Sequence, residues 1–332
     1  PLDEETDDDD PADDADSTTA PAVCKIDKID DTYYYSTLDD AITAATDDDQ
    51  IDLLTNIEMD TGLTFTGKTL TISGSGTYTL TLKGYGIYAY ESNLTFQDLT
   101  LNLYAKEHTY EHSAGATANL ISNSDLHLKR VTCTISPEGN CGSGMYLYQQ
   151  TNLYLDDSEV TVDAANGSMV DGIMADPSEY DNKPNREVIL NNSRLIATGC
   201  SHAGLMLDPI DMTLENSSEV EVANNGEYGF SLYDGELTMK NSTLKATDND
   251  TGGPYPGWHF GIYVGSLNMD AASTLEAYSN GGSGLGIGSP NGSKKSYIRG
   301  HVICEGNGVR DPGCGGALCV YAEHDELSLI HI

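Results

Sequence analysis

One loop of the chain carries residue types that could bind a sugar. The stretch from Thr247 to His259 reads T-D-N-D-T-G-G-P-Y-P-G-W-H, and it holds the only Trp, Trp258, together with Tyr255 and His259. Aromatic rings on a loop stiffened by Pro pack against the C–H faces of pyranose rings, while polar neighbours bind hydroxyls. The pattern predicts a sugar-binding platform. The alternative is a loop whose rings fold back onto the protein for packing.

A second long loop supplies Tyr104 and Tyr110 to the predicted ligand-binding surface. It runs from Tyr104 to Thr117 (Y-A-K-E-H-T-Y-E-H-S-A-G-A-T). In the repeat described below the two loops are five coils apart, which corresponds to about 24 Å at the spacing of neighbouring strands. They are too far apart to share one small ligand, but both could touch one polymer lying along the molecule.

Two carboxylates at the start of the first loop suggest a cation site. Asp248-Asn249-Asp250-Thr251-Gly252 begins like a calcium-binding loop, but the Gly comes one place early and position 12 is His259. The segment therefore fails as a loop of that class. A looser calcium site at Asp248 and Asp250 stays open, and we expect no cofactor to be required.

The elements that position these loops are short strands. From Gly229 to Ala246 the apolar residues alternate in three pairs, separated by polar corners at Asp234-Gly235 and Asn241-Ser242. Each pair has the two-residue period of a strand with one buried face. A single ribbon of this kind cannot bury its apolar side, so it needs copies of itself above and below.

The copies are present along most of the chain. They begin at leading glycines, which are Gly144, Gly172, Gly204, Gly229, Gly261 and Gly286. We therefore predict an all-β fold, a single-stranded right-handed parallel β-helix of about ten coils, on the order of 50 Å long. Stacked Asn and Ser side chains at equivalent corners, such as Asn191-Asn192-Ser193, are expected to form hydrogen-bonded ladders.

The chain divides into four expected segments. Residues 1–22 hold ten acidic and no basic residues and should be a disordered spacer. Residues 23–50 form an N-terminal cap with a short helix over 37–45, begun by Ser36 or Thr37. Residues 51–326 form the β-helix. Residues 327–332 (L-S-L-I-H-I) correspond in reverse translation to a sequencing adaptor, so we expect an assembly scar and a natural chain that continues.

The formal charge of −37 restricts the partners of the 332-residue chain. It comes from 53 acidic and 16 basic residues, and −27 remains outside residues 1–22. This balance argues against nucleic acid and anionic membranes as partners, and no stretch is apolar for long enough to span a membrane. Solubility is one explanation of the acidity, and cation binding by the carboxylates is the alternative. Most of the seven cysteines are expected to be small apolar core residues. The spacing also allows a bridge between Cys133 and Cys141, or between two of Cys304, Cys314 and Cys319.

The entry into the first coil resembles a known family. From Tyr34 to Ile57 the sequence Y-Y-S-T-L-D-D-A-I-T-A-A-T-D-D-D-Q-I-D-L-L-T-N-I is similar to bacterial surface proteins with a pectate-lyase-like parallel β-helix, often described as adhesive domains. Asp49-Gln50 stand where that family usually has Gly-Asp. The resemblance implies the fold and an extracellular, secreted or cell-surface location.

A catalytic interpretation is the main alternative. Lyases on this fold use Arg or Lys beside carboxylate-bound calcium, and the glycosidases use grouped Asp residues. Asp171-Gly172 followed by Ser201-His202-Ala203-Gly204 faintly resembles the D-G and G-H-G elements of polygalacturonases, but Ser201 and Ala203 flank the His and no R-I-K follows.

The sequence thus favours an exported, monomeric surface β-helix that binds a polysaccharide or host glycan through its loops without catalysis. The alternatives are a lyase or hydrolase acting on acidic polysaccharide, and a structural stalk. Acidic side chains grouped with an Arg or Lys in one outward groove would favour the enzyme. Aromatic loops along one side would favour binding.

Overall fold

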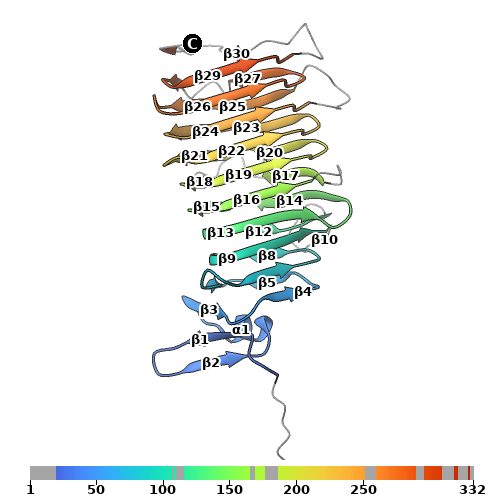
Figure 1. The fold of residues 1–332 in the computed structure, drawn as a ribbon, viewed down its shortest axis with the longest axis vertical. Helices are drawn as coiled ribbons and strands as arrows, with labels where there is room; N and C mark the ends of the chain where they lie inside the picture. Colours follow the sequence, from blue (N-terminus) through green and yellow to red (C-terminus); the bar gives the residue numbers. More distant parts are fainter. Residues whose placement is uncertain are drawn as a thin grey trace, which may run out of the picture.

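A computed structural model describes residues 20–106, 108–109, 116–164, 169–175, 186–250, 259–288, 295–308, 318–320 and 328–329. The described chain is almost entirely β, with one short helix, and its strands stack in successive coils along one axis (Figure 1). Nearly all the pairings between coils are parallel, as expected for the predicted right-handed parallel β-helix.

Each coil contributes strands to three faces. The first face stacks, in order, β5 (Leu63–Thr66), β8 (Ile87–Tyr90), β12 (Leu120–Ser122), β14 (Cys141–Tyr148), β17 (Met169–Ala175), β20 (Ala203–Leu207), β23 (Tyr228–Lys240), β25 (Phe260–Met269), β27 (Ser283–Ile287) and β30 (Leu318–Val320). These ten strands match the predicted number of about ten coils.

The second face begins one strand earlier. It stacks β3 (Asp49–Leu53), β6 (Thr69–Ser73), β9 (Asn93–Ala105), β13 (Asp125–Pro137), β15 (Asn152–Asp156), β18 (Glu187–Asn191), β21 (Asp211–Glu215), the second halves of β23 and β25, β28 (Tyr297–Ile298) and β31 (Ser328–Leu329). The last strand lies within residues 327–332, the predicted assembly scar, and it pairs with β28.

The third face completes each coil. It stacks β4 (Ile57–Met59), β7 (Thr79–Leu82), the second halves of β9 and β13, β16 (Glu159–Asp163), β19 (Arg194–Thr198), β22 (Glu219–Ala223), β24 (Thr243–Thr247), β26 (Thr274–Tyr278) and β29 (His301–Glu305). Outside the three faces, β10 (His108–Thr109) pairs with β11 (Ala116–Thr117).

The N-terminal cap combines an antiparallel hairpin with the predicted helix. β1 (Cys24–Asp27) pairs with both β2 (Thr32–Tyr35) and β3, and the hairpin was not expected from the sequence. Helix α1 (Leu38–Ala44) begins after Thr37, whose Oγ1 accepts a hydrogen bond from the Asp40 backbone N–H at 3.1 Å. Leu38 and Ile42 are buried in the core, so the helix covers the start of the stack as predicted.

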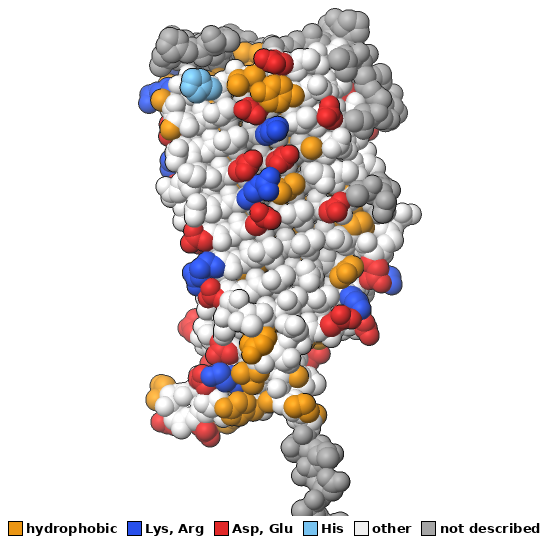
Figure 2. All heavy atoms as spheres, in the orientation of Figure 1, with side chains coloured by type: hydrophobic (Ala, Val, Ile, Leu, Met, Phe, Trp, Pro, Cys, Tyr) orange, Lys and Arg blue, Asp and Glu red, His pale blue; other side chains and the backbone are white. Residues whose placement is uncertain are grey.

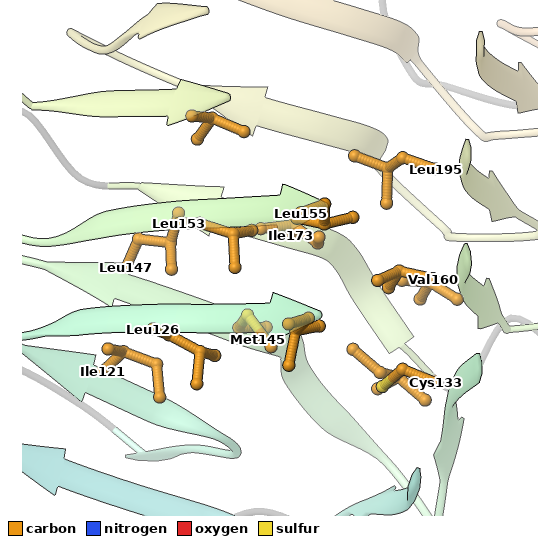
Figure 3. Packing of buried hydrophobic residues seen from close by; sticks show 14 of the residues in the cluster. Ile121, Leu126, Cys133, Met145, Leu147, Leu153, Leu155, Val160, Ile173 and Leu195 are labelled. Carbon is orange, nitrogen blue, oxygen red and sulfur yellow. The ribbon is translucent and has the colours of Figure 1, made fainter. Parts of the chain in front are cut away.

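The core is a set of side-chain columns. Inward residues of neighbouring coils meet in register, as Cys133, Val160 and Leu195 do on the third face (Figure 3). In the coil from Gly229 to Ala246 the residues predicted to point inward are all completely buried, namely Phe230, Leu232, Leu237, Met239 and Leu244. Each coil thus needs its neighbours to complete the burial of its apolar side.

The cysteines belong to this core. Cys24, Cys133, Cys141 and Cys200 are buried and form no disulfide, so the bridge that the spacing allowed between Cys133 and Cys141 is absent. Burial raises the pKa of the Cys133 thiol to about 12. Cys314 and Cys319 lie outside the residues whose side chains are described.

Three of the leading glycines, Gly204, Gly229 and Gly261, lie against a ladder of buried amides. At the corner between the third and first faces, which we call the third-to-first corner, Asn225, Asn249, Asn280 and Asn307 stack in consecutive coils. Each Nδ2 donates to the Oδ1 of the next Asn at 2.9 Å. A Cβ on Gly229 would lie 2.7 Å from the Asn249 Nδ2, which explains why this position is glycine.

The strand register shows that one of the predicted leading glycines was assigned to the wrong position. Because Ile262 pairs with Leu285, the residue equivalent to Gly261 is Gly284, and the predicted leading Gly286 falls two places too late. The Asn and Ser ladder predicted at the corner between the second and third faces is present. Asn216 Nδ2 donates to Asn191 Oδ1 at 2.6 Å, and the Ser193 backbone N–H donates to Ser218 Oγ at 3.1 Å.

Candidate functional site

The two loops predicted to bind a ligand both leave the stack at the third-to-first corner. One follows the third-face part of β9 and the other follows β24, so the strand register places five coils between them, as predicted. Tyr104 is half-buried on β9. Trp258, Tyr255 and Tyr110 lie outside the described residues.

His259 belongs to a group of ionisable side chains at this corner, which we call the imidazole–carboxylate cluster. It consists of Asp171, His202, Glu227, Asp250 and His259, with Tyr228 among them. His202 precedes β20, Glu227 precedes β23 and His259 precedes β25, so these three come from consecutive coils. The parallel stack therefore assembles the cluster from residues far apart in the sequence.

Carboxylates and imidazoles alternate along the cluster. His202 Nδ1 lies 2.7 Å from Asp171 Oδ1, and its Nε2 lies 3.5 Å from Glu227 Oε2. The same Glu227 oxygen lies 3.4 Å from His259 Nε2. The series ends where His259 Nδ1 lies 3.5 Å from Asp250 Oδ1.

The members of the cluster differ in their access to solvent. The side chains of His202 and Glu227 are 29% and 19% exposed, whereas that of His259 is 6% exposed. Asp171 and Asp250 are buried. A ligand approaching the corner would therefore meet His202 and Glu227 first, with the other residues behind them.

Local backbone contacts hold these residues in place. The N–H groups of Glu227 and Tyr228 both donate to the carbonyl of His202, at 2.8 and 3.1 Å, and the His202 N–H donates to Val170 O at 2.9 Å. Asp171 Oδ1 also accepts the Ala203 N–H at 3.2 Å. The site is thus fixed by the same coil-to-coil bonding that builds the stack.

The charges and the burial of the cluster shift the pKa values of two of its residues, His202 and Tyr228. The hydrogen bond to Asp171 raises the pKa of His202, burial opposes this, and the charges of Asp171 and Glu227 add to the rise. Burial raises the pKa of Tyr228, and the nearby Glu227, Asp250 and Tyr233 act in the same direction. His202 therefore holds a proton more strongly than an ordinary histidine does.

One aromatic ring contacts the cluster, and further rings lie on the first-face strands of the same coils. The Tyr228 ring meets His202 edge to face at 5.7 Å between centroids, and His259 likewise at 4.8 Å. Tyr233, which is 43% exposed, stacks on Tyr263 at 5.6 Å, and Phe260 lies against Tyr263 at 5.0 Å. The exposed Tyr233 ring offers a flat apolar surface on the coil that carries Glu227.

The two residues of the predicted calcium site differ in environment. Asp248 is exposed, whereas Asp250 is buried beside His259, and both have a left-handed backbone with φ of 53° and 61°. Within the described parts of the chain, no group of three or more His, Cys, Asp or Glu side chains is arranged to hold a metal ion.

A separate groove lies outside the corner between the second and third faces. Its volume is about 440 Å³, and its lining includes Arg130 and Arg194 together with acidic residues such as Glu219. Arg130 makes two hydrogen bonds to Asp98, at 2.6 and 2.8 Å, and Arg194 pairs with Glu219 at 3.2 Å. The groove has the composition expected of an enzyme, but carboxylates of the protein already pair with both guanidinium groups.

Comparisons of the chain with protein-family models, with curated proteins and with solved structures found no match. The described helix is too short and too polar to be a membrane-spanning segment.

Glu227 and Tyr228 were missed by the sequence analysis, although a signal for them exists. His202, Glu227 and His259 each stand two residues before a leading glycine, which is Gly204, Gly229 or Gly261. Aligning the coils on these glycines places the three side chains in one column. Asp171 and His202 were noted only for a faint likeness to polygalacturonases.

Proposed function

We propose that this protein is an exported, surface-displayed β-helix that binds a polysaccharide or host glycan without catalysis, like the adhesive domains that its first coil resembles. The imidazole–carboxylate cluster supports this function most directly. It places partly exposed hydrogen-bonding groups on the same coil as the exposed Tyr233 ring, and polar groups together with an aromatic surface suit a sugar ligand.

The positions of the loops add to this support. The two predicted loops leave the same corner of the stack, so a polymer lying parallel to the axis would pass both. We propose that the protein acts as a monomer and is extracellular. No cofactor is needed for this binding, and calcium at Asp248 and Asp250 is a proposal that the same experiment tests.

A glycan array probed with the purified chain, with and without calcium, tests the proposal. We expect binding to at least one class of polysaccharide. Trp258→Ala should weaken it by about tenfold or more, because a stacking ring is lost. Tyr34→Ala is the matched control, since Tyr34 is 64% exposed on β2 in the cap and should leave binding unchanged.

Failure to bind any glycan would leave the stalk as the better explanation. If the chain binds glycan only in the presence of calcium, Asp248→Asn should abolish the glycan binding that calcium permits.

A polysaccharide lyase or hydrolase is the second candidate. Two observations favour it, the short contact between Asp171 and His202 and the groove that contains Arg130 and Arg194. An imidazole oriented by a carboxylate is suited to general base catalysis. Incubation with polygalacturonate, with and without calcium, should release no unsaturated or shortened product, and release of either would overturn the non-catalytic proposal.

A further inference from the structure

The imidazole–carboxylate cluster has an unusual charge balance. Every other ion pair in the described part of the chain contains a Lys or Arg, as in the pairing of Arg194 with Glu219 and Glu221 at 3.2 and 2.9 Å. In the cluster, the partners of Asp171, Glu227 and Asp250 are imidazoles, which are cationic only when protonated. When His202 is neutral, the Asp171 and Glu227 carboxylates on either side of it have no Lys or Arg partner among the described ion pairs, which favours a positive ligand.

One polar atom of the cluster also has spare hydrogen-bonding capacity. His259 Nδ1 is buried and makes no hydrogen bond, with Asp250 Oδ1 at 3.5 Å. Its other nitrogen is 3.4 Å from Glu227 Oε2, again longer than a normal hydrogen bond. Buried polar atoms are usually satisfied, so this spacing suits a site completed by a further donor group.

The aromatic residue at the centre of the cluster fits the same ligand. The Tyr228 ring lies between His202 and His259. The negative face of an aromatic ring attracts ammonium groups, and carboxylates accept their hydrogen bonds. An ammonium beside Glu227 and Tyr228 would satisfy both, whereas a carboxylate-bearing sugar would be repelled by Asp171, Glu227 and Asp250.

We propose that the cluster binds a protonated primary amine carried by the glycan, so that the ligand is a polymer containing amino sugars with free ammonium groups. This inference rests on the proposed glycan binding and narrows its ligand class. Glu227 accepts hydrogen bonds from the ammonium, Tyr228 packs against it, and Asp171 holds His202.

The proposal implies a direction for the pH dependence. His202 faces Asp171 on β17, Glu227 and Tyr228 on the next coil, and no described Lys or Arg forms an ion pair with these groups. Acidification adds positive charge at His202, beside the Glu227 carboxylate that would hold the ammonium, and this charge repels the ligand. Affinity should therefore fall as the pH decreases from 8 to 5, and it should also fall with added salt.

Calorimetric titration of the intact chain with three tetrasaccharides tests the proposal. The probes are β-1,4-linked glucosamine, its N-acetylated form and galacturonic acid. We expect the free amine to bind at least about tenfold more tightly than the N-acetylated form, and galacturonic acid to bind least. Glu227→Gln should reduce the preference for the free amine at least about tenfold, whereas Glu305→Gln on β29 removes the same charge from an exposed site and should not change it.

The outcomes separate this inference from the proposed function. Equal binding of the amine and its N-acetylated form would overturn the amine site and leave glycan binding intact. If no probe binds and the array is also blank, the proposed function itself fails. Should Glu227→Gln not fold, affinity of the native chain for the amine that is unchanged between pH 8 and 5 would overturn the inference by itself.

Discussion

The contact between Asp171 and His202 decides how the cluster responds to protons. Asp171 is buried and its Oδ1 lies 2.7 Å from His202 Nδ1, so the carboxylate both orients the ring and favours its protonated form. Because the pKa of His202 is raised in the folded state, its protonation contributes stability. That stability is fully present below the ordinary pKa of histidine and is lost as the pH rises through the raised value.

Replacing Asp171 by Asn should lower the pKa of His202. The amide oxygen can still accept a hydrogen bond from Nδ1, so the change removes mainly the charge. An NMR titration of the histidine ring protons measures the shift, with His127 on β13 as internal reference, since burial is the main cause of its lowered pKa. The stability of the variant should also decline less as the pH rises through the titration of His202. An unchanged His202 pKa would contradict the assigned role of Asp171.

At the scale of the elements, the third-to-first corner is held by its amide ladder. Asn249 is buried and uses both ends of its side chain. Its Oδ1 accepts from the Asn225 backbone N–H and Nδ2, at 3.1 and 2.9 Å, and its Nδ2 donates to Val222 O and Asn280 Oδ1, at 3.1 and 2.9 Å. The ladder lies directly beside the cluster, because Asn249 precedes Asp250 in the chain.

Asn249→Ala should cost about 3 kcal/mol, because it leaves buried partners above and below without hydrogen bonds. Asn307→Ala is the matched control. Asn307 occupies the last described rung and is only half-buried, so water can replace its bonds and the cost should be about 1 kcal/mol. Urea unfolding followed by circular dichroism measures both. Equal costs would show that the ladder does not act as a continuous buried element.

The alternation of apolar and polar residues made most of the strands predictable from the sequence. The contacts between residues of different coils were not predictable in this way. The two-residue period of Leu237 and Met239 predicted that both side chains point inward, and Thr37 predicted where the helix begins. Three features were missed, namely the hairpin of β1 and β2, the Asn ladder at the third-to-first corner and the column of His202, Glu227 and His259. Each of these features depends on which residues of different coils come into register. Because the loops vary in length, that register cannot be derived from the spacing in the sequence. The misplacement of the leading glycine at 286 has the same origin.

At the scale of the whole molecule, the fold is a rod with ionisable groups along its outside. Figure 2 shows basic side chains next to acidic ones on the face that it presents. Lys83 pairs with Glu58 and Lys240 with Glu215 on the outside of the stack. These pairs are exposed, so each contributes little to stability. The excess of acidic residues remains, since the chain has 53 of them against 16 basic ones.

This excess should make the stability of the rod depend on salt. Like charges distributed along a stack repel one another, and the repulsion reaches about 30 Å at 10 mM ionic strength but only about 8 Å at 150 mM. The thermal midpoint should therefore rise by about 2 °C between these concentrations of NaCl at pH 7, in contrast to a fold held by surface ion pairs, which salt weakens. Circular dichroism measures the midpoint.

Magnesium chloride and calcium chloride at matched ionic strength provide the control, because both salts screen charge equally. A specific calcium site at Asp248 and Asp250 would raise the thermal midpoint further in calcium chloride, and Asp248→Asn would remove this additional rise. A midpoint that falls with NaCl would mean that the outward ion pairs outweigh the net repulsion.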